Sequence, residues 1–428
     1  MLGCCDKLTT HVDRVVFYLG CFVVDGWRAF LKSFDGKIIF FSAFLVLCNY
    51  YYFYFVDFYQ GVSGGGWVFS TLKFFGIFLV SASLLRISPR VDEKELWCVA
   101  FFFISALTLF FLKGVLLGFD DGMFLNTFLC LIPFLVLRLR RGRETVVFFF
   151  ECCLFILIFQ IFLDQIIYWA GSSLWENQAF VGGVGNPSSF GLLCNLLLCY
   201  VLFERRATFS SALFSFVLAY GVCRSNSLLA LISLVLVLFF YFFERRSWSR
   251  FAYVLVVFCF SVYLGGQAHL FYKIDSLAGL ALEGDVGGSA SVSTRLHIHY
   301  EFLDNLLSNP LGALFYGFTN KAYMAYDSQF LTYFSSFGLI FSLLFFLSFF
   351  LVLLRCLFGG VDYFVFVGLL IFSLTFLTNR ILDYYPMPIF FALLVVLASE
   401  RSSCKGRLFS LGQRSLSFCS TKSERLSS

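Results

Sequence analysis

The chain has 428 residues, of which 60% are hydrophobic, 21% are aromatic and only 13% are charged. A soluble domain of this length cannot keep so much apolar side chain away from water, so the composition excludes a soluble globular fold and indicates a polytopic membrane protein. The net charge of +5 comes from short Lys/Arg clusters between apolar runs, which argues against a nucleic-acid-binding surface.

Apolar runs of about 17–23 residues recur between residues 38 and 398, and a helix of that length crosses roughly 30 Å of hydrocarbon. We therefore predict an all-α fold with about twelve membrane-spanning helices. In chain order they cover residues 37–57, 67–85, 96–118, 123–137, 146–169, 187–203, 208–223, 226–243, 249–265, 332–354, 361–378 and 385–399.

The segments outside these spans differ in character. Residues 1–36 are predicted to be a cytoplasmic segment without a cleavable signal. Spans one to nine occupy residues 37–265, and residues 266–331 form one long loop before the last three spans at 332–399. Residues 400–428 are rich in Ser and Arg, which predicts a disordered basic tail.

The connections between spans alternate in charge. Basic connections include RLRRGRE at 138–144, ERR at 204–206 and ERRSWSR at 244–250. Neutral or acidic ones include FDDG at 119–122 and GSSLWENQAFVGGVGNP at 171–187. Because cytoplasmic loops retain Lys and Arg, this alternation predicts that both termini are cytoplasmic and that the loop at 266–331 lies outside.

The 15 cysteines are scattered through the spans and the termini. None lies in the loop at 266–331, and no CxxC pair or His/Cys cluster has the spacing of a zinc site. We expect neither a disulfide framework there, nor a metal, nor a cofactor.

Several arginines fall on the predicted outer side, where the charge bias disfavours them: Arg224, Arg295 and Arg380. Such a residue either extends harmlessly to the headgroups or binds an anion. Arg224 lies in the tight junction CRSN at 223–226. Its guanidinium must therefore lie at the headgroup level or between helices.

The stretch STRLHIHYEFLDNLLSNP at 293–310 predicts a helix in the outer loop. Ser293 or Thr294 is expected to cap it, and Asn309-Pro310 is expected to end it. An apolar stripe predicts that this helix lies against the membrane or against the helical bundle. The stripe comprises Leu296, Tyr300, Leu303 and Leu307.

Ionisable residues in and after this helix are candidates for chemistry. Arg295 and His299 are four residues apart, so a fixed cation and an imidazole can reach the same ligand, unless both are simply solvated. Asp327 stands where the chain re-enters the membrane and is either a general base or a helix cap.

The glycine-rich stretch VGGVGNPSSFG at 181–191 precedes a span. Backbone N–H groups there can bind an anion at a helix start. The alternative is that Asn186-Pro187 makes an ordinary helix entry.

Three of these stretches together resemble the O-antigen polymerase/ligase superfamily of bacterial inner-membrane glycosyltransferases. They are GNPSSFG at 185–191, CRSNSLLALISL at 223–234, and the outer-loop stretch continuing to DSQFLTYFSSFGLIFSLLFF at 327–346. The long outer loop before the last few spans fits as well, and the resemblance covers roughly residues 180–355.

The resemblance implies a GT-C-like helical fold and a metal-independent transferase acting on a glycan linked to undecaprenyl pyrophosphate. It implies that Arg224 and Arg295 bind the pyrophosphate. Arg380 and Asn186 are further substrate-binding candidates. Asp327 is the first candidate base, with His299 and Glu301 in reserve.

Two departures from the family pattern bear on the activity. Ligases, which transfer the finished chain to lipid A-core, typically carry a His, often followed by Asn, where this chain has Asp327-Ser328. An Arg-x10-Gly pattern described for some polymerases is not met, because Leu306 stands eleven positions after Arg295. The first departure favours a polymerase, while His297 or His299 leaves the ligase open.

The leading hypothesis is an O-antigen polymerase of the inner membrane that joins lipid-linked repeat units in lipopolysaccharide biosynthesis. An O-antigen ligase is the alternative, and a polytopic transporter or flippase is the hypothesis from a different class. A transporter would place ionisable residues at mid-membrane and show inverted repeats, whereas this chain gathers its polar residues in outer loops. Membrane lipid and, by resemblance, a chain-length regulator protein are further partners.

Overall fold

The computed structural model describes most of the chain from the fifth predicted span onward. The described residues are 34–48, 143–172, 174–175, 178–205, 208–244, 247–267, 290–318, 326, 328–358, 362–395 and 397–398, with single positions at 71, 75, 79, 104, 108 and 111. Throughout these residues the regular structure is helical, with no strand, so the all-α prediction is confirmed for this part of the chain.

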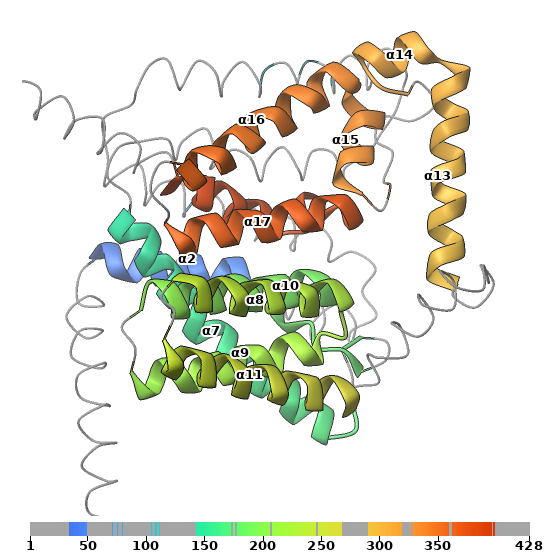
Figure 1. Ribbon diagram of the computed structural model, residues 1–428. Coiled ribbons are helices and arrows are strands. Elements are labelled where there is room, and N and C mark those ends of the chain that lie inside the picture. Colours follow the sequence, from blue (N-terminus) through green and yellow to red (C-terminus); the bar gives the residue numbers. More distant parts are fainter. Residues whose placement is uncertain are drawn as a thin grey trace, which may run out of the picture.

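The helices are arranged as one bundle with a shorter helical arm (Figure 1). The bundle contains α2 (Phe34–Leu47), α7 (Arg143–Trp169), α8 (Pro187–Phe203), α9 (Phe209–Arg224), α10 (Leu228–Glu244), α11 (Trp248–Gln267), α16 (Leu339–Phe358), α17 (Tyr363–Thr378) and a last helix at 387–395. The arm contains α13 (Ala290–Ser308), α14 (Pro310–Phe315) and α15 (Gln329–Phe337).

Most predicted spans that can be compared with observed helices agree closely with them. Helix α8 has the predicted bounds, and α7, α9, α10, α11 and α17 differ from their predictions by a few residues. Caps explain several starts, since Asn186, Thr208 and Asp362 each accept a backbone N–H of the first turn. The spans at 67–85, 96–118 and 123–137 lie almost entirely outside the described residues.

One predicted span was wrong. The run at 332–354 is divided between α15 and α16 at Gly338, which has φ +88°. A Cβ at this position would lie 2.7 Å from the backbone carbon of Phe315. The chain bends here because α14 packs directly on a backbone that has no side chain.

Two of the described helical stretches are both long and apolar enough to cross a membrane, Val146–Trp169 and Leu339–Phe358. The shorter apolar helices of 16 or 17 residues extend about 24–26 Å at 1.5 Å per residue. The fold is therefore consistent with a helical membrane protein.

From α7 onward, consecutive helices of the bundle run in opposite directions, which gives it two distinct ends (Figure 1). We call the end that carries residues 170–172, 174–175, 178–186, 225–227 and 379–386 the loop end. The opposite end, with Arg143, Glu204, Arg250 and Asp362, is called the ion-pair end. Helix α13 stands across the loop end, roughly perpendicular to the bundle helices (Figure 1).

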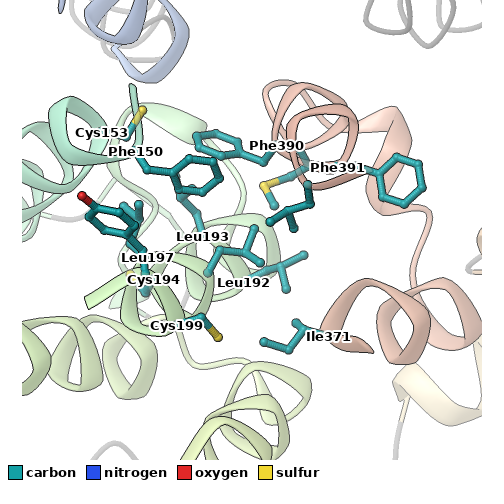
Figure 2. Packing of buried hydrophobic residues seen from close by; sticks show 14 of the residues in the cluster. Phe150, Cys153, Leu192, Leu193, Cys194, Leu197, Cys199, Ile371, Phe390 and Phe391 are labelled. Atoms are coloured by element: carbon teal, nitrogen blue, oxygen red, sulfur yellow. The ribbon is translucent and has the colours of Figure 1, made fainter. Parts of the chain in front are cut away.

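Helix α8 is the centre of the bundle and is buried along most of its length. Its apolar side chains pack against α7, against α17 and against the helix at 387–395 (Figure 2). The ring of Phe150 stands edge-on to that of Phe390, with centroids 5.6 Å apart. Such a pair contributes about 0.5–1.5 kcal/mol beyond the burial of its surface.

Short polar contacts fix the ion-pair end. Arg143 donates to Asp362 at 2.7 Å and also pairs with Glu204, which joins the starts of α7 and α17 to the end of α8. Burial alone would lower the pKa of Arg143, but Asp362 and Glu204 outweigh it and raise that pKa above its ordinary value. Two further pairs, Arg205 with Glu151 and Arg250 with Glu244, lie at the same end.

The arm differs from its prediction at two points. Helix α13 begins at Ala290, so Ser293 and Thr294 lie inside it and do not cap it. It ends at Ser308 as expected, and Asn309 caps α14 instead. An Asn-Pro pair both stops one helix and starts the next, because Pro at the first helical position needs no N–H partner.

The predicted apolar stripe of α13 does not pack on the bundle. Tyr300, Leu303 and Leu307 are exposed, whereas Phe302 is buried against Phe318. The cluster around Phe302 also includes Tyr326 and Phe334 of the arm. Contact of the exposed stripe with a membrane surface stays a prediction.

Candidate anion-binding site at the loop end

Arg224 is the last residue of α9 and lies between two aromatic rings. Its guanidinium carbon is 4.2 Å from the ring centroid of Tyr168, at the end of α7, and 4.7 Å from that of Phe180. The backbone carbonyl of Arg224 accepts the N–H of Phe180 at 2.9 Å. Each cation–π contact contributes about 0.5–2 kcal/mol and also fixes the plane of the guanidinium.

One edge of this guanidinium has no acceptor among the residues that the structure describes. The Nε and Nη2 atoms are buried and donate to no group in the described part of the chain. These two nitrogens point in the same direction and form the fork that binds carboxylate or phosphate oxygens bidentately. An unpaired buried donor lowers the stability of the fold by about 1–3 kcal/mol. A bound anion would pair these donors and remove that cost.

Two polar residues of α7 hold the loop that carries Phe180. The buried carboxylate of Asp164 accepts the N–H groups of Val181 and Gly182, at 3.0 and 2.8 Å. Gln160, one turn earlier, accepts the N–H of Gly183 at 3.1 Å and donates to the carbonyl of Leu47 at 3.0 Å. The loop is thereby fixed to α7 and α2.

These contacts decide between the two interpretations of the glycine-rich stretch. The N–H groups of residues 181–183 are already bonded to Asp164 and Gln160, so they are not presented to an anion. The side chain of Asn186 accepts the N–H of Ser189 at 3.1 Å and caps α8. The ordinary helix entry is what the structure contains, and no described contact tests a substrate-binding role for Asn186.

Arg380 lies in a second polar region of the loop end. It precedes the short helix η5 (Ile381–Asp383), and its guanidinium carbon lies 5.6 Å from the ring centroid of Tyr384. Gln329, fully buried at the start of α15, accepts the N–H of Leu382 at 2.8 Å and donates to Asp383 at 3.3 Å. The start of α15 and the segment after Arg380 are thus joined directly.

The structure describes two of the three candidate bases. His299 and Glu301 lie on α13 and are exposed. Asp327 lies outside the described residues, and so does the side chain of Arg295, whose backbone belongs to α13.

The two neighbours of Asp327 are nevertheless well defined. Tyr326 donates its N–H to Thr332 Oγ1 at 3.1 Å, and Ser328 Oγ donates to the carbonyl of Phe376 at 3.1 Å. Burial raises the pKa of Tyr326 to about 12, with a further contribution from the nearby Glu301 carboxylate. Ser328 caps α15. The helix cap, which was the alternative role for Asp327, is therefore supplied by the next residue.

Sequence reasoning missed Asp164, Gln160, Tyr168 and Phe180. An Asp and a Gln four residues apart inside an apolar span are a usable signal, because such groups in a membrane helix must be paired. Nothing in the sequence indicates that Tyr168 and Phe180 enclose Arg224, since 21% of the chain is aromatic. Across the described residues, no group of three or more His, Cys, Asp or Glu side chains is placed to hold a metal ion.

Comparison with protein-family models gives no match for this chain, and comparison with curated proteins gives no significant one.

Proposed function

We propose that this protein is an O-antigen polymerase of the bacterial inner membrane, with a GT-C-like fold of about twelve spans. It would join oligosaccharide repeat units carried on undecaprenyl pyrophosphate at the outer face. The loop end would face outward and the ion-pair end, with its clustered arginines, would face the cytoplasm. The resemblance of three sequence stretches to the polymerase/ligase superfamily is the basis of this proposal.

The observation that supports it best is the unpaired fork of Arg224. A pyrophosphate offers several oxygens to a guanidinium, and Nε and Nη2 together fit two of them. The rings of Tyr168 and Phe180 hold the fork in place before a ligand arrives. Preorganised charge of this kind stabilises a leaving group without reorganisation during the reaction.

The reaction would be one displacement at the anomeric carbon. The acceptor hydroxyl oxygen forms the new glycosidic bond while the bond from that carbon to the pyrophosphate oxygen breaks. The hydroxyl proton passes to a base, and the electron pair of the broken bond leaves with the lipid pyrophosphate. Arg224 and Arg295 would stabilise the negative charge that develops there.

Asp327 is the proposed base, with Glu301 and His299 as alternatives. Its two neighbours in the sequence, Tyr326 and Ser328, are both fixed by hydrogen bonds. The Glu301 carboxylate of α13 contributes to the raised pKa of Tyr326, the residue before Asp327.

The experiment is gel analysis of lipopolysaccharide from a deletion strain complemented with variants. The deletion should leave core with a single repeat unit, and the wild-type gene should restore the ladder of long chains. Arg224→Ala should fail to restore the ladder, and Arg224→Lys should restore it poorly, because an ammonium cannot form the bidentate fork. Arg355→Ala is the matched control, since Arg355 is exposed at the far end of α16.

Each result discriminates between functions. Core without any repeat unit in the deletion strain would point to the ligase or to an earlier step, and not to a polymerase. A full ladder with Arg224→Ala, at normal membrane abundance, would remove Arg224 from the mechanism.

A further inference from the structure

The ion-pair end contains a cavity that the proposed reaction does not use. It has a volume of about 790 Å³ and opens between the ends of α8 and α10 and the starts of α9 and α11. Cavities of about 300–1,000 Å³ are the usual size for small-ligand sites. Helix α9 separates this cavity from Arg224 by its 16 residues, which is about 24 Å.

Two arginines and one glutamate line the cavity, namely Arg205, Arg250 and Glu244. Arg250 is satisfied by Glu244 at 2.6 Å and by the carbonyl of Tyr241 at 3.1 Å. The Nη2 of Arg205 lies 3.0 Å from Glu151. Its Nη1 is buried and donates to no group in the described part of the chain.

The position of Arg205 is fixed independently of any ligand. Its guanidinium carbon lies 4.9 Å from the ring centroid of Phe214, and the side chain is 15% exposed. Glu151 is in turn held by the hydroxyl of Tyr200 at 2.8 Å. The Arg205 side chain, which lines the cavity, is therefore held rigidly.

The surroundings of the cavity favour an anion with several oxygens. The hydroxyl-bearing residues Thr208, Ser211, Ser215 and Ser247 line it. Helices α9 and α11 both start there, and the partial positive charge of a helix start is favourable for an anion. A tetrahedral phosphate has enough acceptor oxygens to engage several donors at once.

Exposed aromatic residues place the cavity at a particular depth. Trp248 is 86% exposed at the start of α11, and Phe209 is 74% exposed at the start of α9. In membrane proteins Trp gathers at the level of the lipid headgroups. Basic pockets between helices at that level bind phosphate-bearing headgroups.

We propose that this cavity is a binding site for a phosphate group, carried by a phospholipid or by a soluble phosphate, with Arg205 as its principal donor. The site is separate from the glycan site and does not depend on the polymerase assignment.

The test uses the purified full-length protein and two probes. Retention of lipid is measured by native mass spectrometry after transfer from vesicles of equimolar phosphatidylglycerol and phosphatidylcholine. Binding of inorganic phosphate to the delipidated protein is measured by the shift of its thermal unfolding temperature. Lipid retention without a phosphate shift identifies a lipid source, and a phosphate shift without lipid retention identifies a soluble source; either supports the site.

Three variants keep the test falsifiable. Ala212→Trp places an indole in the cavity and replaces no member of an ion pair, and Leu213→Trp, an exposed neighbour outside the lining, is its control. Arg205→Lys keeps a cation beside Glu151 and removes the second nitrogen, which avoids an unpaired carboxylate. We expect binding to weaken about tenfold or more in Ala212→Trp and Arg205→Lys, the effect of losing one charge-assisted hydrogen bond.

The proposal is overturned if the wild-type protein binds neither probe. It is equally overturned if Ala212→Trp, folded and at normal yield, binds as the wild type does.

Discussion

Asp164 shows how one side chain can position a binding site through the backbone. Its carboxylate bonds the N–H groups of Val181 and Gly182, and the adjoining Phe180 encloses Arg224. Asp164→Ala leaves two buried N–H groups unpaired, at a cost of about 1–3 kcal/mol each. We expect a lower thermal unfolding temperature and loss of the long-chain ladder, whereas Asp164→Asn, which keeps an acceptor oxygen, should be milder in both. Equal behaviour of the Ala variant and the wild type would exclude this positioning role.

Asp327 can be separated from a structural role by its amide variant. A general base needs an ionisable carboxylate, so Asp327→Asn should abolish chain growth at normal membrane abundance. The cap of α15 is already supplied by Ser328, so Ser328→Ala should instead lower stability by about 1 kcal/mol. Chain length on a gel and protein level on a blot distinguish the two. Wild-type chains from Asp327→Asn would move the role to Glu301 or His299.

Among the elements, the loop at 178–186 depends on close backbone contact. A Cβ at Gly183 would lie 1.8 Å from the carbonyl oxygen of Leu47, in α2. Gly183→Ala must therefore push the loop away from α2, and we expect a marked drop in unfolding temperature. Gly171→Ala is the control, because a Cβ at this position meets nothing within 4 Å. This substitution costs only the strain of an Ala in the left-handed backbone conformation, about 1–2 kcal/mol. A Gly183 variant no less stable than the Gly171 variant would show that this packing is unimportant.

How far the sequence predicts these elements depends on which forces define them. Apolar length and caps set the bounds of α8 and α17, and both are local properties of the chain. The break at Gly338 could not be predicted, because the backbone of α14 causes it from more than twenty residues away. The same holds for Phe302 of α13, which is buried by residues of the arm.

The candidate site was predicted in part for a similar reason. Charge bias singled out Arg224 without any structural information. Tyr168 and Phe180, which enclose Arg224, precede it by 44 or more positions in the sequence and are close to it only in the folded chain. Gln160 and Asp164 were visible as polar residues in an apolar span, yet only the fold shows that they hold residues 181–183.

For the whole molecule, the two ends of the bundle should face opposite sides of the membrane. Ser308 lies in the arm beyond the loop end, and Ser247 lies at the ion-pair end. In a background with all 15 cysteines replaced, Ser308→Cys should react with an impermeant thiol reagent from outside. Ser247→Cys should react only after the inner membrane is permeabilised. Labelling of both positions from the same side would contradict the proposed orientation.

The measurement that tests the proposed function most directly is polymerisation by the purified protein. Undecaprenyl-pyrophosphate-linked repeat units would be supplied as both donor and acceptor in nanodiscs, and the products separated by mass. A polymerase yields glycans of two or more repeats and releases one lipid pyrophosphate for each new glycosidic bond, and Arg224→Ala should slow this release by about 100-fold or more. Products of a single repeat transferred to added lipid A-core, or no release of lipid pyrophosphate by a folded wild-type protein, would contradict the account.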